Sequence, residues 1–238
     1  MSSDARKRFN TAFPRGKAFL PVIHCRGFSQ TLKNARIAFR EGADGIFLIG
    51  HGLPAAELTR IYTHLRLHFA RQWIGINFLD LEPLEVLGGA PATASALWMD
   101  DVGVREDAAE PDAEAKHFFE MRQAGAGAYS GPVFGGVAFK YQHPPTKNLA
   151  RAAQLAMPYA DVITTSGPAT GKPPSVEKIR AMREAIGDHP LANASGLTIT
   201  NASQYREYVD AALVGTSITD EDGVLIPWKV YAFRRRWH

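Results

Sequence analysis

The sequence predicts one (β/α)8 barrel, a single domain that spans residues 1–238. Short apolar runs alternate eight times with segments of helical spacing, and this alternation requires a parallel sheet with helical crossovers. Eight such units in a chain of this length favour a closed barrel over an open doubly wound sheet. The open sheet would need a glycine-rich fingerprint after its first strand, and segment 24–28 is not one.

Each expected strand is a mostly apolar run that ends near glycine or small polar residues. In chain order the strands are expected at 18–24, 45–50, 73–79, 96–100, 133–139, 161–165, 191–194 and 211–214. The fifth of these is weakened by Gly135 and Gly136, because glycine contributes no side chain to pack in a strand. All eight runs are short enough for strands and too short for membrane spans.

The expected helices follow the strands and carry apolar residues three and four positions apart. They are expected at 30–41, 54–69, 83–87, 112–124, 146–157, 176–186, a short segment after Asn201, and 227–237. Gly42 ends the first helix, and the third is unusually short. Asn201 is expected to cap the seventh, with Gln204 as its reciprocal partner. Residues 1–17 form an N-terminal extension, and 224–238 form the last helix with a basic tail.

Composition limits the class of protein. The 45% hydrophobic content suits a large core, and the net charge is only +3 although the pI is near 9.0. Basic residues cluster at 6–8 and 234–236, where we expect solvated termini rather than nucleic-acid binding. The single cysteine, Cys25, excludes an internal disulfide and favours a cytoplasmic protein. The N-terminus lacks a signal-peptide apolar region, no membrane partner is expected, and a homo-oligomer is left open.

The last two strands predict a phosphate site. Ser195 and Gly196 follow one strand, and Gly215 and Thr216 follow the next. Consecutive small turns put free backbone N–H groups side by side, and a following helix N-terminus would add partial positive charge. In (β/α)8 barrels the loops after strands seven and eight build such a site. The alternative is two ordinary strand-to-helix turns.

Catalytic candidates are polar residues at the expected strand ends, where barrel active sites lie. We expect Asp100 as proton-transfer residue, with Asn77 and Lys140 orienting substrate or stabilising charge, and His24 as a site or packed histidine. The other polar strand-end residues are His51, Asp80, Asp101, Thr165 and Ser166. No cofactor is predicted; Asp100 could hold a divalent metal, but no spacing resembles a zinc site.

Strand alternation predicts that Asp100, and not Asp101, points into the barrel mouth, where it meets Asn77. A nearby cation would hold Asp100 ionised, whereas a dry wall of Trp98 and Phe139 would raise its pKa. Because Lys140 and the phosphate turns suggest a wet mouth, we expect the ionised, base-like form. The polar loops 101–111 and 166–174 are expected to act as lids.

The loop 164–174, T-T-S-G-P-A-T-G-K-P-P, resembles a T-G-x-x-T-G-x-P-P loop of the BtpA/SgcQ family of TIM barrels. Residues 195–198 with Asn201, and 214–217, are similar to its last two strands, and His24 stands where the family has a histidine. The resemblance covers about residues 21–217 and implies a barrel of the ribulose-phosphate-binding type. It also suggests Thr165, Ser166, Thr170 and Gly171 as a substrate loop.

The chain departs from the family after its first two strands. Segment 25–28 replaces a usual Pro-Leu-Pro-Gly, and Gly50-His51 stands where a Glu-Asn pair is usual, so the chain resembles a divergent member. Some family members are linked to photosystem I biogenesis and others to sugar metabolism. We expect an isomerase or lyase that acts on a phosphorylated sugar or nucleotide-like small molecule. The alternative is a non-catalytic binding or assembly factor.

Overall fold

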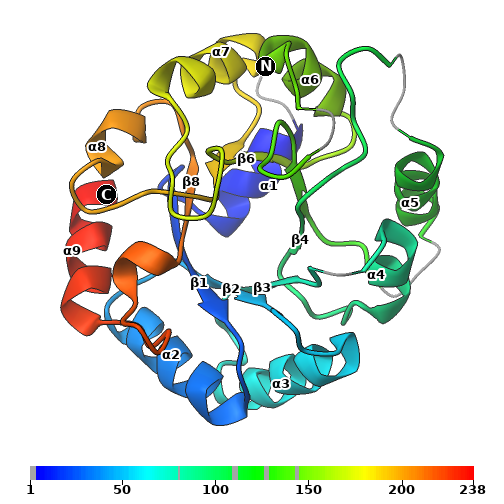
Figure 1. Cartoon of the computed structure of the whole chain (residues 1–238). Helices are drawn as coiled ribbons and strands as arrows, with labels where there is room; N and C mark the ends of the chain where they lie inside the picture. The colour runs from blue at the N-terminus through cyan, green and yellow to red at the C-terminus, as the bar shows by residue number, and fades with distance from the viewer. Residues whose placement is uncertain (1–3, 80, 109–111, 126–128, 143–144) are drawn as a thin grey trace.

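The computed structural model describes residues 4–79, 81–108, 112–125, 129–142 and 145–238, with the backbone alone at Glu114. Eight parallel strands close into a barrel in the order β1 to β8, and β8 pairs with β1, as the sequence predicts. The helices surround the strands as a ring (Figure 1). The strands are β1 Ala18–His24, β2 Ile46–Ile49, β3 Ile74–Asn77, β4 Leu97–Met99, β5 Val133–Gly136, β6 Val162–Thr165, β7 Leu191–Asn193 and β8 Ala211–Val214.

The described helices agree with the expected ones except at their ends and for two additional helices, α1 at the N-terminus and the short 3-10 helix η1 after β8. They are α1 Asp4–Ala12, α2 Phe28–Arg40, α3 Ala55–His68, α4 Pro83–Gly89, α5 Ala113–Gln123, α6 Leu149–Ala156, α7 Val176–Ile186, α8 Ala202–Tyr205, the 3-10 helix η1 Thr216–Ile218 and α9 Pro227–Trp237. Strand β5 ends earlier than expected. Ala138 has a left-handed φ of 49°, which breaks the extended conformation and places Lys140 on the following loop.

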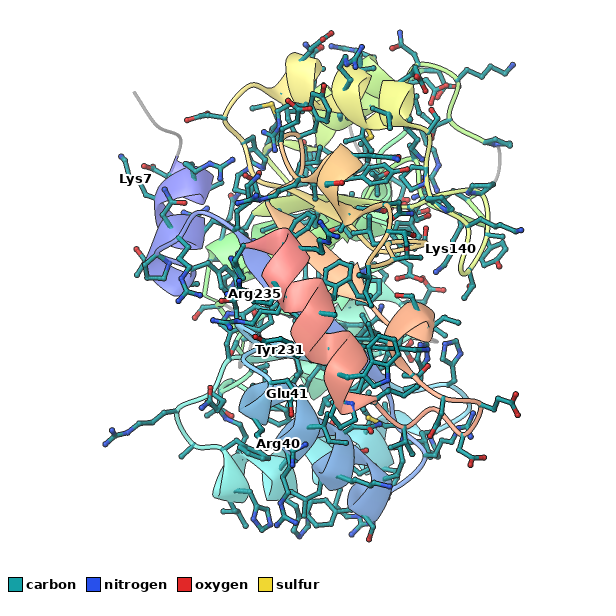
Figure 2. All side chains as sticks on the ribbon, turned by 90° about the vertical axis from the view of Figure 1, so that its left-hand side faces the viewer. Lys7, Arg40, Glu41, Lys140, Tyr231 and Arg235 are labelled. Atoms are coloured by element: carbon teal, nitrogen blue, oxygen red, sulfur yellow. The ribbon has the colours of Figure 1, made fainter. Side chains whose placement is uncertain are left out.

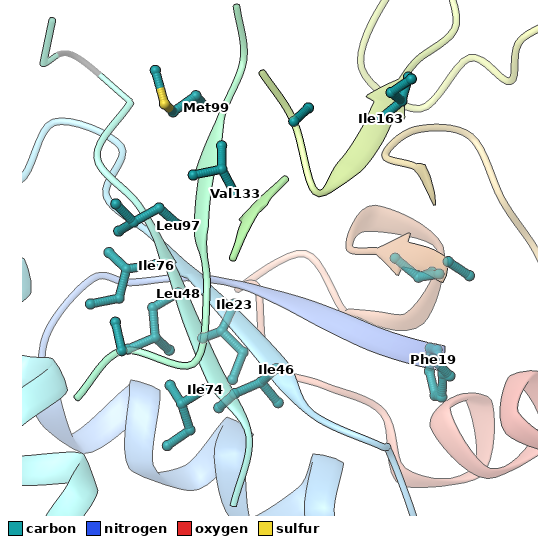
Figure 3. Close-up of a cluster of buried hydrophobic side chains, with 14 of the residues drawn as sticks. Phe19, Ile23, Ile46, Leu48, Ile74, Ile76, Leu97, Met99, Val133 and Ile163 are labelled. Atoms are coloured by element: carbon teal, nitrogen blue, oxygen red, sulfur yellow. The ribbon is translucent and has the colours of Figure 1, made fainter. Parts of the chain in front are cut away.

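Strand alternation divides the apolar residues into two layers. In β2, Phe47 and Ile49 belong to the cluster inside the barrel, whereas Ile46 and Leu48 belong to the cluster between strands and helices. Figure 3 shows the latter cluster, with Leu48 of β2 beside Ile76 of β3 and Ile46 nearer Ile74. Because each strand is buried on both faces, polar side chains can reach solvent only at the strand ends.

Helix α1 closes the amino-terminal end of the barrel. Its Phe9, with Phe13 just beyond, joins the interior cluster. Arg6 donates to Asp210 at 2.8 Å and Arg8 to Asp161 at 2.5 Å. The expectation that residues 6–8 are solvated is therefore wrong for Arg6, whose side chain is mostly buried, whereas Lys7 and Arg8 stay more than half exposed. Figure 2 shows Lys7 on α1 and Lys140 at opposite ends of the molecule.

At two glycines, another part of the chain lies closer to the backbone than a side chain would allow. A Cβ on Gly75 would overlap the Phe47 ring inside the barrel, and a Cβ on Gly136 would overlap the Asp100 carbonyl. Val102 then donates its N–H to the Gly136 carbonyl at 3.2 Å, which ties the end of β4 to β5. Gly136 is thus needed for the position of Asp100. None of the described helices has the length and apolarity needed to cross a membrane.

Candidate active site

A cavity of about 380 Å³ opens at the carboxyl ends of the strands. It brings together residues at or after the carboxyl ends of all eight strands, which lie far apart in the sequence. The predicted site residues that line it are His24, Asp100, Lys140, Thr170, Gly171, Ser195, Gly196, Gly215 and Thr216, with His51 beside them. A cavity of this volume suits a small molecule.

The turns after β7 and β8 converge on this cavity, as the sequence predicts. Within the described part of the chain, no hydrogen bond uses the backbone N–H of Gly196, Leu197, Gly215, Thr216 or Ser217 as its donor. Free N–H groups from two adjacent turns are a suitable arrangement for a phosphate or another anion.

Helix α8 contributes less to this site than expected, because it has only four residues. Asn201 makes no side-chain cap, so the expected cap with Gln204 is wrong. Its Oδ1 instead accepts from the Thr198 N–H at 2.8 Å, and its Nδ2 donates to the Gly196 carbonyl at 2.9 Å. Asn201 therefore holds the shape of the anion turn rather than starting a helix.

Asp100 faces the cavity, and Asn77 lies behind it. Asn77 Nδ2 donates to Asp100 Oδ1 at 2.9 Å, the contact that strand alternation predicts. Asn77 lines a neighbouring cavity of about 570 Å³ rather than the main one. Asp101 points away and pairs with Arg105 at 2.7 Å.

Burial raises the pKa of Asp100, and this effect outweighs the Asn77 hydrogen bond and the charge of Lys140. We expected nearby cations to keep the pKa of Asp100 low, and this expectation is wrong because the pKa is raised. The inward-facing Trp98, 4% exposed and in edge contact with Phe139, contributes the dry wall.

His24, at the end of β1, stacks on His51, which follows the neighbouring strand β2, with ring centroids 4.8 Å apart. Burial, and then the nearby His51 and Lys140, lower the pKa of His24 to about 4. His24 is therefore a neutral imidazole near pH 7, which can donate or accept a proton.

Two lysines lie near the end of β5. Lys140 forms no ion pair within the described residues, and its ammonium lies 5.3 Å from the centre of the Phe139 ring. Lys178 of α7 is mostly buried; it donates to the carbonyls of Ala138 at 2.5 Å and Ser166 at 2.7 Å. Burial lowers the pKa of Lys178 to about 8. The sequence did not single out Lys178, because a lysine in a helix resembles a surface residue.

Thr165 and Ser166 lie outside the main cavity. The Thr165 hydroxyl donates to the Ala138 carbonyl, and the Ser166 hydroxyl accepts from the Lys140 N–H at 2.7 Å. Both residues support the loop that carries Lys140. Asp80 lies outside the described residues.

The expected lid after β6 has a packed base and an exposed tip. At its base, the Gly167 N–H donates to Ser195 Oγ, which in turn donates to the Lys172 carbonyl. At its tip, Thr170 and Gly171 are exposed and reach the cavity. The other expected lid, 101–111, lies only partly within the described residues. Its described part is held by the Asp101–Arg105 pair.

Cys25 is buried, and burial raises the pKa of its thiol to about 11, as expected of a packed residue rather than a nucleophile. Among the described residues, no group of three or more His, Cys, Asp or Glu side chains is arranged to hold a metal ion.

The closed barrel with a cavity at the carboxyl ends of its strands defines the chain as a TIM barrel. Tryptophan synthase from M. tuberculosis in its aminoacrylate-bound form matches with a TM-score of 0.70 at 13% identity, covering 100% of this chain and 100% of that chain. Phosphoribosylanthranilate isomerase from Thermotoga maritima matches with a TM-score of 0.62 at 15% identity, covering 93% and 98%.

A third solved structure is (S)-3-O-geranylgeranylglyceryl phosphate synthase from Thermoplasma acidophilum, in complex with its substrate sn-glycerol-1-phosphate. It matches with a TM-score of 0.65 at 12% identity, covering 99% of this chain and 98% of that one. At such identities the likeness shows the fold alone. No family model and no curated protein matches the chain in sequence, so the resemblance to the BtpA/SgcQ family remains a prediction.

Proposed function

We propose that this protein is an enzyme of the isomerase or lyase type that moves protons on a phosphorylated small molecule. The observation that carries the proposal is the convergence of two turns with unbonded N–H groups on a cavity that also contains Asp100 and Lys140. The solved structures with this fold include an isomerase and a synthase bound to a glycerol phosphate, which is consistent with the proposal. A phosphorylated sugar or a nucleotide-like compound is the substrate class that the sequence predicts.

In this mechanism the turns at Gly196 and Gly215 hold the phosphate and fix the position of the substrate. Asp100 removes or delivers the proton, and its raised pKa brings it closer to the working range of an acid–base catalyst. Asn77 orients the Asp100 carboxyl group through their hydrogen bond. The Lys140 ammonium, also in the cavity, stabilises negative charge that develops on the substrate.

The alternative function, a binding or assembly factor without catalysis, would be favoured by a filled mouth with Asp100 in an ion pair. Asp100 instead hydrogen-bonds an uncharged amide and faces an open cavity. This arrangement supports the enzyme.

The test is thermal unfolding of the full chain with inorganic phosphate and with a panel of phosphosugars and nucleotides. A ligand at a hundred times its Kd stabilises the folded state by about 2.7 kcal/mol, which raises Tm by roughly 5–10 °C in a domain of this size. Gly215→Val should remove most of this increase, because the new side chain enters the mouth 3.4 Å from His24 Nε2.

Gly215 is the suitable position for this substitution because its φ of −118° is not left-handed, and a Cβ there meets no atom closer than 3.4 Å. Gly196 is not suitable, because its φ is +68° and a Cβ there would overlap the Lys172–Pro173 backbone. Gly88→Val, where a Cβ meets nothing within 4 Å, is the matched control and should keep the full increase. Equal phosphate effects in the two variants would show that the turns do not bind phosphate.

A further inference from the structure

We propose that the substrate is a phosphate ester whose remaining part is a compact apolar or aromatic group rather than a polyhydroxyl chain. This inference rests on the proposed function, because it assumes that the turns after β7 and β8 bind the phosphate. It narrows the substrate class by considering which protein side chains the part of the ligand beyond the phosphate must contact.

The order of the strands determines how a ligand crosses the mouth. The phosphate turns follow β7 and β8, whereas Asp100 and Lys140 follow β4 and β5. In a closed ring of eight strands, β4 and β8 stand opposite each other. A molecule that reaches from the phosphate turns to Asp100 must therefore lie across the floor of the cavity.

That floor is apolar. It is formed by inward-facing Val22, Ile49, Trp98 and Leu213, which lie on four different strands and are each no more than 5% exposed. These side chains offer van der Waals contact to a ligand. The Trp98 indole N–H has no hydrogen-bond partner within the described residues and is itself buried.

Three of the hydroxyl groups that line the cavity, on the turns after β7 and β8, already have protein partners. Ser195 Oγ donates to the Lys172 carbonyl at 3.0 Å, and Ser217 Oγ donates to the Leu197 carbonyl at 2.6 Å. Thr198 Oγ1 bonds Thr200 Oγ1 at 2.9 Å and accepts from the Asn201 N–H. These hydroxyls hold the turn after β7 and connect it to η1.

A sugar chain placed on this floor would bury hydroxyl groups with few partners, and unpartnered buried hydroxyls are costly. An apolar group gains affinity from the same contacts. At the far end of the ligand, Asp100 and Lys140 suit one functional group, whereas His24 lies beside the phosphate turn at Gly215. The geometry therefore fits a phosphate at one end, an apolar body over the floor, and one reactive polar group near Asp100.

The experiment measures the affinity of the full chain for four probes by calorimetry: inorganic phosphate, phenyl phosphate, glycerol 3-phosphate and ribose 5-phosphate. Phenyl phosphate should bind about tenfold or more tightly than ribose 5-phosphate, a ratio that corresponds to about 1.4 kcal/mol. Ribose 5-phosphate binding as tightly as phenyl phosphate would overturn the inference about the apolar body while leaving the phosphate site intact. Failure of all four probes would refute the phosphate site and this inference together.

A pair of variants tests whether the preference for phenyl phosphate comes from the apolar floor of the cavity. Val22→Thr keeps the shape of the side chain and adds a hydroxyl under the ligand, so it should weaken phenyl phosphate several-fold and leave inorganic phosphate unchanged. Val162→Thr makes the same change inside the barrel at a residue that does not line the cavity, and should alter neither affinity. If both variants affect phenyl phosphate equally, the apolar body does not lie on the Val22 floor. The probe series on the native chain tests the inference without any variant.

Discussion

His24 should make the stability of this protein sensitive to mild acid. Burial, His51 and Lys140 lower its pKa to about 4 in the folded chain, against an ordinary value of 6.5 for histidine. A group with a depressed pKa contributes stability that is complete above the unfolded-state pKa and is lost as the pH falls toward the folded-state pKa. The loss therefore falls between about pH 6.5 and pH 4. At about pH 5 these two pKa values correspond to a loss of roughly 2 kcal/mol relative to neutral pH.

The assay is urea unfolding at about pH 7 and pH 5 for the native chain and for His24→Asn. The native chain should lose about 2 kcal/mol more than the variant, because asparagine does not titrate. His117→Asn, on the exposed surface of α5, is the matched control and should retain the native pH dependence. The same pH dependence in the native chain and His24→Asn would refute the argument.

NMR titration of the His24 ring gives its pKa directly and adds a test of the phosphate site. Position 215 lies beside the ring, since a Cβ there would be 3.4 Å from Nε2. A bound phosphate near Gly215 favours the charged imidazolium, so saturation with phosphate should raise the pKa of His24. An unchanged pKa at saturating phosphate would place the anion elsewhere.

Three further predictions concern the residues around Asp100. Once a substrate is known, Asp100→Asn should still bind it but lose turnover about a hundredfold or more, whereas Asp101→Asn should change turnover little. Native turnover in Asp100→Asn would show that another group transfers the proton. Gly136→Ala should lower Tm and displace Asp100, because the new methyl group overlaps the Asp100 carbonyl; a crystal structure with Asp100 unmoved would contradict this. Burial holds the pKa of Lys178 at about 8 in the folded chain, below its usual value. The free energy of unfolding of the native chain should therefore rise relative to that of Lys178→Met between about pH 8 and pH 10. The same change with pH in both proteins, measured by urea unfolding, would contradict this prediction.

The barrel could be predicted from the sequence because its signal is repeated along the chain. Each apolar run is followed by a helical segment, so a misplaced end such as that of β5 leaves the topology unchanged. The convergence of the turns at Gly196 and Gly215 could be predicted as well, because closure of the barrel places consecutive strand ends side by side. Strand alternation likewise predicts the Asp100–Asn77 contact.

What could not be predicted depends on contacts between distant segments. Asn201 has the spacing of a helix cap, yet its side chain is used by the turn that precedes it. The substrate-loop residues Thr165 and Ser166 hold a neighbouring loop, which the motif does not reveal. Lys178 and Gly136 look ordinary in the sequence, because their importance comes from the Ala138 and Asp100 carbonyls that they meet in the fold.

The closure of the barrel by α1 has a consequence for biosynthesis. Arg8 and Arg6 pair with Asp161 and Asp210, so α1, which is synthesised before all eight strands, bonds to carboxylates made much later. Burial would raise the pKa values of both aspartates, but the arginines and backbone N–H groups lower them, so the pairs are ionised near neutral pH. Until strand β8 has been synthesised, α1 with Phe9 and the following Phe13 cannot pack against the completed barrel. We therefore expect translation intermediates that end before β8 to be sensitive to proteases at α1, and this sensitivity should disappear once β8 has been synthesised and has folded.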